Sequence, residues 1–150
     1  MKAWLQRVSE ASVTVDGEKI AQIGKGFLVL LGVTHSDTDA IADKVAAKIA
    51  DLRLFEDENG AMNLGIRDVG GDVIVVSQFT LYADVSHGRR PGFSAAARGP
   101  VAEPIYEHLV ARLREILGPG RVQTGRFGAD MKVALVNDGP VSVEVEIDKE

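Results

Sequence analysis

The stretch Val136–Glu146, VNDGPVSVEVE, decides how the end of this chain folds. From Val141 to Asp148 apolar and polar residues alternate, a period of two that is typical of a strand with one buried face. The upstream segment Met131–Leu135 alternates in the same way. Between the two halves lies Gly139-Pro140, and proline removes a ladder hydrogen bond, so it belongs at a strand start, an edge or a bulge. The pattern predicts a long strand that is interrupted at this dipeptide.

Working outward from this stretch, five more segments are strand-like. Ala3–Val15 leads through the tight-turn signal Asp16-Gly17 into Lys19–Ile23. Gly26–Val33, GFLVLLGV, is a continuous apolar run between glycines, which is typical of a strand buried on both faces. Val73–Val76 is a second apolar run of this kind, and a short strand is expected near Arg121–Thr124.

Two segments change to the helical period. The first follows His35 and ends before the turn Glu56–Gly60, and Ser36 with Asp39 resembles a capping box at its start. The second is expected over Glu103–Leu117 and is stopped by Gly118-Pro119. The residues predicted to face inward are Ile41, Val45, Ile49 and Leu52 in the first helix, and Ile105, Leu109, Leu113 and Ile116 in the second.

The order strands, helix, strands, helix, strands predicts an α+β fold. We expect a mostly antiparallel or mixed sheet that curls toward a barrel, with two amphipathic helices packed on it. The chain has 150 residues and shows no repeat, linker or low-complexity segment, so a single domain over residues 1–150 is expected.

The composition excludes several classes of protein. The absence of cysteine excludes disulfides and cysteine-based metal sites or nucleophiles. No apolar run resembles a signal peptide or approaches the roughly 20 residues of a membrane span, so a cytoplasmic protein with no membrane partner is expected. The three histidines His35, His87 and His108 are far apart, His108 being expected on a helix surface, and no glycine-rich phosphate-binding motif is present. We therefore expect neither a metal nor another cofactor.

The charge is acidic overall but uneven. A net charge of −5 argues against a protein that grips long nucleic acid, and no DNA partner is expected. Between His87 and Arg98 there are three arginines and no acids. This segment is either a solvated loop or a small anion-contacting patch, suited to the end of a nucleic acid but not to its length.

One cluster of polar side chains is a candidate for chemistry. The apolar strand Val73–Val76 ends in Ser77, Gln78 and Thr80, which surround Phe79. The end of a buried strand is a rigid place from which to present polar groups. The alternative is that these side chains only satisfy loop backbone. No base stands beside Thr80 in the sequence, which argues against its use as a nucleophile.

Two stretches together resemble the paired signatures of the D-aminoacyl-tRNA deacylases, the D-tyrosyl-tRNA(Tyr) deacylase family. Ser77–Asp84, SQFTLYAD, resembles a Ser-Gln-x-x-Leu segment, and Asn137–Ser142, NDGPVS, resembles an Asn-x-Gly-Pro-Val-Thr segment. Flanks such as QRVSEASVTVDGE, RLFEDENGAMNL and GRRPGF extend the resemblance over nearly the whole chain. Ser142 stands where the family has threonine, which keeps the hydroxyl and loses one methyl, so a small packing change and retained activity are expected.

The resemblance implies a hydrolase that cleaves the ester between a D-amino acid and the terminal adenosine of tRNA. Glycine on the wrong tRNA is implied as a second substrate, and the biological role implied is chirality proofreading in translation. It also implies a homodimer in which the Gly139-Pro140 peptide is cis and each subunit inserts it into the pocket of the other. Main-chain carbonyls there would collide with an L side chain and leave room for a D side chain.

The same resemblance implies roles for individual residues. Backbone N–H groups near Gln78 and Phe79 would hold the ester carbonyl, while Ser77 and Gln78 shape the pocket. Water attack assisted by the RNA 2′-hydroxyl is favoured over attack by Thr80. The residues expected to bind substrate are Gly139, Pro140, Arg7, Asn137, Phe93 and Met131. Two other classes stay open, a non-catalytic RNA-binding module and a purely structural dimerisation domain.

Overall fold

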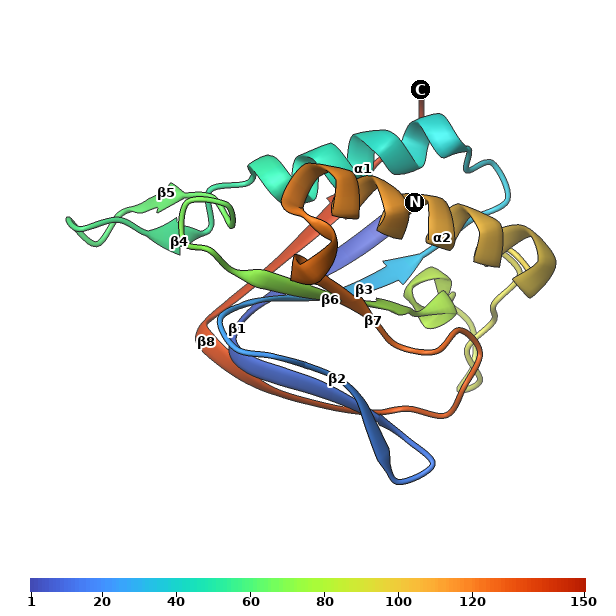
Figure 1. Cartoon of the computed structure of the whole chain (residues 1–150). Coiled ribbons are helices and arrows are strands. Elements are labelled where there is room, and N and C mark those ends of the chain that lie inside the picture. The colour runs from blue at the N-terminus through green and yellow to red at the C-terminus, as the bar shows by residue number, and fades with distance from the viewer.

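Strands form most of the chain, and two long helices cover one side of them (Figure 1). The structure is a computed structural model that describes residues 1–150. Its elements are β1 (Lys2–Val15), β2 (Glu18–Ile23), β3 (Gly26–Gly32), α1 (Asp39–Asp51), β4 (Phe55–Glu56), β5 (Met62–Leu64), β6 (Asp72–Ser77), the 3₁₀ helix η1 (Phe79–Tyr82), α2 (Gly99–Leu117), the 3₁₀ helix η2 (Pro119–Arg121), β7 (Val122–Thr124) and β8 (Lys132–Glu146).

The long strand β1 organises the sheet. It pairs antiparallel with β3, β2 and β8, while β6 runs parallel to β3, and β7 runs parallel to β6. The Gln123 side chain on β7 accepts a hydrogen bond from the Gln22 amide of β2 and donates one to the Gln22 carbonyl, both at 2.8 Å. These two bonds join β7 to β2, so the mixed sheet is nearly closed. The predicted α+β class with a sheet curling toward a barrel is confirmed.

The apolar residues form two cores, one on each face of the sheet. One cluster consists of residues of β1, β2, β3 and β6, namely Val8, Ala11, Val13, Val15, Ala21, Ile23, Leu28, Ile74 and Val76. The larger cluster lies between the sheet and the helices α1 and α2, which lie side by side on the same face (Figure 1). No helix is long and apolar enough to cross a membrane.

Both helices differ in detail from the sequence prediction. Thr38, and not a Ser36–Asp39 capping box, is the N-cap of α1, and its hydroxyl accepts a hydrogen bond from the Ile41 amide at 3.3 Å. Helix α2 begins at Gly99, earlier than predicted, because the missing N–H of Pro100 costs nothing in a first turn. The predicted inward residues Leu52, Ile105 and Ile116 are only partly buried, whereas Ala102 and Tyr106 are buried.

Strand β8 runs as one element from Lys132 to Glu146, and the predicted interruption at Gly139-Pro140 is a bulge in its pairing with β1. Its partner β1 pairs on both sides of the proline, with Gln6 opposite Ser142 and Val8 opposite Asn137. Asp138–Val141 are looped out between these two pairs. The proline therefore sits in a wide bulge, where its missing N–H leaves no gap in the ladder.

The core between sheet and helices predicts a contrast between two residues of α2. Leu109 is fully buried, whereas Val101 is half exposed. We expect Leu109→Ala to lower the free energy of unfolding by about 2–5 kcal/mol, because it opens a cavity. Val101→Ala should change it by less than about 0.5 kcal/mol. Urea denaturation of the two variants measures both values, and equal losses would contradict this placement of the core.

Candidate active site

A pocket of about 460 Å³ opens where β3 and β6 end. Parallel strands present their carboxyl ends at the same edge of a sheet, and here Leu31 pairs with Ser77 at that edge. The loop after η1, the start of α2 and the loop before β8 supply the other walls. The lining residues are Leu31, Val33, Ser77, Gln78, Phe79, Phe93, Ala96, Ala97, Arg98, Gly99, Ala102, Phe127, Gly128, Ala129 and Met131.

The chain turns sharply at this edge to form η1. The Gln78 amide donates to the Leu31 carbonyl at 2.8 Å, which extends the β3–β6 ladder by one more bond. η1 then packs directly against Gly32. A Cβ on Gly32 would lie 3.1 Å from the Leu81 Cβ and 3.2 Å from the Gln78 carbonyl oxygen, so glycine permits this close approach.

The start of η1 presents backbone donors. Phe79 and Thr80 are its first two residues, and the amides of a first helical turn have no acceptor within the helix. The N-cap residue Gln78 supplies no side-chain acceptor to them. The family resemblance implies the amides of Gln78 and Phe79 for the ester carbonyl. The Gln78 amide already donates to the Leu31 carbonyl, so it is not available to a substrate. The amide of Phe79 stays a candidate, and that of Thr80 joins it.

Three aromatic rings surround the pocket. Phe79 and Phe93 pack edge to face with ring centroids 5.0 Å apart, and both rings are exposed. Phe127 lies 5.9 Å from the ring of Tyr106. Burial raises the pKa of the Tyr106 hydroxyl above its ordinary value, and this hydroxyl donates to the Val75 carbonyl at 2.7 Å. Exposed aromatic faces beside a cleft are suited to stacking on a nucleobase.

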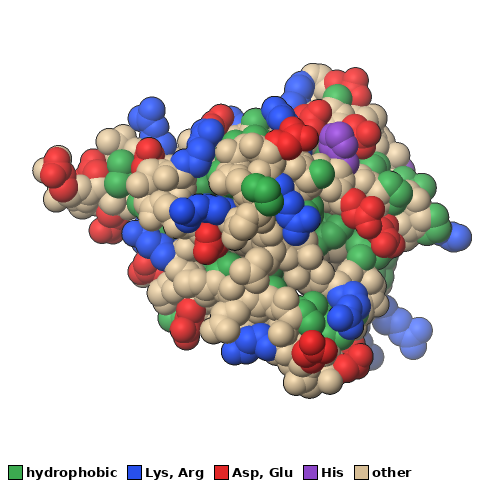
Figure 2. Space-filling view, viewed as in Figure 1, with side chains coloured by type: hydrophobic (Ala, Val, Ile, Leu, Met, Phe, Trp, Pro, Cys, Tyr) green, Lys and Arg blue, Asp and Glu red, His purple; other side chains and the backbone are tan.

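Positive charge is confined to one side of the pocket. Arg98 is the only charged lining residue, and Arg89 and Arg90 are exposed on the preceding loop. That loop is closed at its base by paired backbone hydrogen bonds between Asp84 and Gly92 at 2.7 and 2.8 Å. The view in Figure 2 shows acidic and basic side chains interspersed, without a broad surface of one sign.

The pocket contains no side chain that could act as a base. None of its lining residues is a histidine, lysine, aspartate or glutamate. Thr80 is exposed and lies outside the lining, and its hydroxyl makes no hydrogen bond within the chain. No group of three histidine, aspartate or glutamate side chains comes together to hold a metal ion. Chemistry in this pocket would have to use backbone donors and groups of the bound molecule.

The remaining predicted residues lie away from this pocket, at the other end of β3. Arg7 is buried, and it donates from Nε to the Asp138 carbonyl at 2.9 Å and from one terminal nitrogen to the Leu54 carbonyl at 2.7 Å. Gly139-Pro140 is cis, as the resemblance implies, and both residues are exposed. Asn137 accepts from the Gln6 amide group at 3.3 Å.

Apart from Thr80, which lies outside the lining, the structure divides the predicted residues into two groups. Ser77, Gln78, Phe79, Phe93 and Met131 line one pocket. The second group is separate from the pocket. It consists of the exposed bulge residues Gly139 and Pro140, together with Asn137 and the buried Arg7, which supports the bulge. Sequence reasoning placed Arg98 only in a candidate anion-contacting segment, and it missed Phe127 in the pocket. Phe127 lies in the stretch TGRFGAD. A lone aromatic residue in such a polar, glycine-containing loop was the signal that could have marked it as a pocket residue.

Comparison with known proteins gives a consistent picture. A family model described as D-Tyr-tRNA(Tyr) deacylase matches residues 4–146. A D-aminoacyl-tRNA deacylase of Symbiobacterium thermophilum is 56% identical over 149 residues, covering 99% of this chain and 97% of that protein. One of Marinobacter nauticus is 55% identical over 146 residues, covering 97% and 94%.

Two solved structures share the fold. The c-Myc DNA Unwinding Element Binding Protein superimposes with a TM-score of 0.93 at 42% identity, covering 98% of this chain and 99% of that chain. A probable eukaryotic D-amino acid tRNA deacylase gives a TM-score of 0.84 at 17% identity, covering 97% and 98%. The likeness to this second structure concerns the fold alone.

The buried guanidinium of Arg7 yields a stability prediction. Arg7→Met leaves the carbonyls of Leu54 and Asp138 without their donor, and we expect it to lower the free energy of unfolding by about 2–5 kcal/mol. Arg67→Met is the matched control, because Arg67 forms an exposed ion pair with Asp51 that is worth about 0–1 kcal/mol. Chemical denaturation of both variants compares them, and similar losses would show that Arg7 does not hold the bulge.

Proposed function

The chain belongs to the D-Tyr-tRNA(Tyr) deacylase family, and we propose that it hydrolyses the ester bond of D-aminoacyl-tRNA. The products are a free D-amino acid and tRNA, and tRNA mischarged with glycine is a second substrate. The observation that carries this proposal is the pocket at the ends of β3 and β6, where two backbone amides of η1 lack an acceptor and no side chain can act as a base. The enzyme acts as one deacylase domain over residues 1–150 in the cytoplasm, and it proofreads chirality in translation.

The substrate is held by its terminal adenosine. Phe79 and Phe93 offer exposed ring faces or edges at the pocket, and Arg98 contributes one positive charge there. Arg89 and Arg90 are free to contact the adjoining phosphates. The chain as a whole carries a net charge of −5, which is unfavourable to RNA binding. The protein therefore grips the acceptor end and not the length of the tRNA.

The backbone of η1 supplies the catalytic stabilisation. Water adds to the ester carbonyl carbon, and the developing oxyanion accepts hydrogen bonds from the amides of Phe79 and Thr80. Such a donor is worth about 3 kcal/mol in the transition state. The C–O bond to adenosine then breaks, and its 3′-oxygen takes up the proton that the attacking water releases by way of the RNA 2′-hydroxyl. The hydroxyl of Thr80 is not the nucleophile, because no base contacts it.

Selectivity comes from a second copy of the chain. Gly139 and Pro140 do not line the pocket of their own subunit, yet they are exposed and held by Arg7 through the Asp138 carbonyl. In a homodimer, the bulge of one subunit closes the pocket of the other. Its main-chain carbonyls then occupy the space that an L side chain needs, while a D side chain or the hydrogen of glycine is accepted.

The surface beside the pocket supports such a dimer. A groove of about 350 Å³ shares Ser77, Gln78, Ala129 and Met131 with the pocket, and its other apolar walls are Leu28, Leu30, Val76, Val133 and Leu135. Strand β8 pairs only with β1, so its outer edge is unpaired. Val136 on that strand is half exposed. An apolar groove beside an open strand edge is suited to association with another chain.

The activity is tested with tyrosyl-tRNA charged with either enantiomer. We expect the purified protein to release D-tyrosine and to leave the L-ester intact. A terminal adenosine that lacks the 2′-hydroxyl should slow hydrolysis strongly. Hydrolysis of both enantiomers at equal rates would refute the selectivity, and tight, salt-sensitive binding of uncharged tRNA without hydrolysis would favour a binding module instead.

The role of the bulge is tested at Gly139. Its φ is +129°, and a Cβ there would lie 2.9 Å from a terminal nitrogen of Arg7 and 3.0 Å from a methyl group of Val141. Gly139→Ala therefore displaces the bulge, and we expect kcat/KM for D-tyrosyl-tRNA to fall by roughly 100-fold. Gly60→Ala is the control, because Gly60 has φ +79° with no atom within 4 Å of a Cβ. Full activity of a folded Gly139→Ala protein would rule out this use of the bulge.

A further inference from the structure

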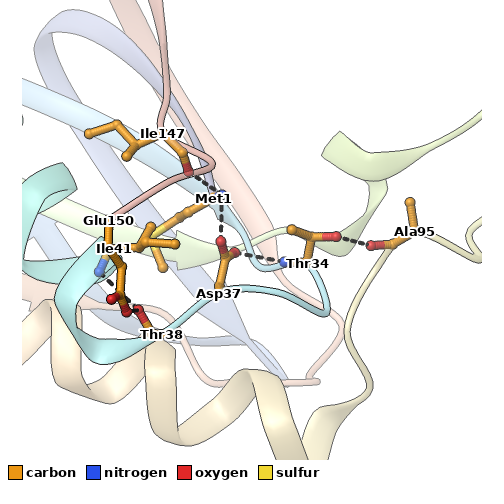
Figure 3. Close-up of polar contacts among 8 residues, drawn as sticks. All are labelled: Met1, Thr34, Asp37, Thr38, Ile41, Ala95, Ile147 and Glu150. Carbon is orange, nitrogen blue, oxygen red and sulfur yellow. Dashed lines mark hydrogen bonds and ion pairs between the residues drawn. The ribbon is translucent and has the colours of Figure 1, made fainter.

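The chain buries two charged side chains, and the proposed function uses only one of them. These residues are Arg7 and Asp37. The Asp37 carboxylate lies in the loop between β3 and α1 and forms an ion pair with the amino group of Met1 at 2.7 Å (Figure 3). Both partners are completely shielded from solvent. A carboxylate buried in this way is costly unless its charge and its hydrogen bonds are matched, so its place in the structure needs a reason.

Asp37 connects this ion pair to the wall of the pocket. Its second carboxylate oxygen accepts from the Thr34 amide at 2.8 Å, and the Asp37 amide donates back to the Thr34 carbonyl at 3.1 Å. The Thr34 hydroxyl in turn donates to the Ala95 carbonyl at 2.5 Å, as Figure 3 shows. The pocket residues Phe93, Ala96, Ala97 and Arg98 all lie within three residues of Ala95 in the chain.

Two further hydrogen bonds hold the same wall against the same loop. The Ala97 amide donates to the Val33 carbonyl at 2.9 Å, and the His35 ring lies 2.7 Å from the Ser94 carbonyl. The segment 93–98 contains no helix or sheet strand of its own until α2 begins. Its position therefore depends on the short loop 33–37, and Asp37 fixes the conformation of that loop.

We propose that Asp37 is a positioning residue for the pocket wall formed by residues 93–98, on which it acts through Thr34. This inference rests on the proposed function for its kinetic consequence, but not for its structural one.

The charge and the hydrogen bonds of the Met1 amino group bear on how Asp37 is held. The Met1 ammonium donates to Asp37 and also to the Ile147 carbonyl at 2.8 Å. An amide at this nitrogen has one hydrogen, so it cannot donate to both acceptors, and it carries no charge. Met1 is fully buried, so an attached group has no room. Acylation or extension would leave Asp37 without its counter-charge and would free the Thr34 loop.

The experiment compares variants of the full chain in kinetics and in hydrogen exchange. Asp37→Asn removes the charge, Thr34→Val removes the link to Ala95, and a single glycine before Met1 replaces the ammonium by an amide. We expect each to raise KM for D-tyrosyl-tRNA by roughly tenfold with kcat little changed, because binding contacts are displaced while the amides of η1 are not. Each should also speed amide exchange in residues 92–98.

A matched control separates positioning from stability. Asp43 on α1 lies 2.8 Å from a ring nitrogen of His108 and has no link to the pocket wall. Asp43→Asn should leave KM and exchange in residues 92–98 unchanged. Thr34→Val combined with Asp37→Asn should raise KM no further than Asp37→Asn alone, because both act along one chain of contacts.

The outcomes are distinct. A loss of stability alone would lower kcat through the folded fraction, with KM and local exchange unchanged, and would overturn the proposal. If Asp37→Asn fails to fold, Thr34→Val and the glycine extension decide by the same two readouts. If no protein hydrolyses the ester, the proposed function fails, while exchange in residues 92–98 still tests the positioning role.

Discussion

The parallel pairing of β3 with β6 is the constraint on which the rest of the structure depends. These two strands are buried on both faces, and their ladder runs from Gly26 opposite Asp72 to Leu31 opposite Ser77. The bond from the Gln78 amide to the Leu31 carbonyl continues it beyond the strand. Because Gly32 leaves no side chain in the way, η1 begins at once, and its first amides are fixed by the sheet and not by a loop. Donors held in this way need no reorganisation when charge develops beside them.

The same central strand β1 also places the bulge of β8. Its residues Gln6 and Val8 pair on either side of Asp138–Val141, and the side chain of Arg7 between them reaches the Asp138 carbonyl. The pocket opens at the carboxyl ends of β3 and β6, whereas Arg7, which holds the bulge, pairs with Phe27 near the start of β3, and Gly139 and Pro140 do not line the pocket of their own subunit. A site that uses both requires a second chain, so catalysis and dimerisation become one requirement in the proposed mechanism.

Much of this fold could be predicted from hydrophobic periodicity. The runs Gly26–Val33 and Val73–Val76 were recognisable as doubly buried strands, and both are. Periodicity carries no information on strand direction, so the parallel pairing could not be predicted from it. Helix starts depend on single side chains, which is why Thr38 replaced the expected cap. Asp37 gave no signal, because its partner is the amino group of the chain and not a side chain.

In the proposed function, the lack of a base in the pocket and the acidic charge of the protein both limit the reaction to a correctly bound substrate. A base would activate water against any ester that reached the pocket, including the L-esters that translation needs. In the proposed mechanism the pocket supplies backbone donors only, so hydrolysis depends on the 2′-hydroxyl of a correctly placed substrate. A net charge of −5 weakens the hold on tRNA outside the acceptor end. Once the ester is cleaved, the contacts of the aminoacyl group are lost and the remaining attraction is small, so the product tRNA leaves readily.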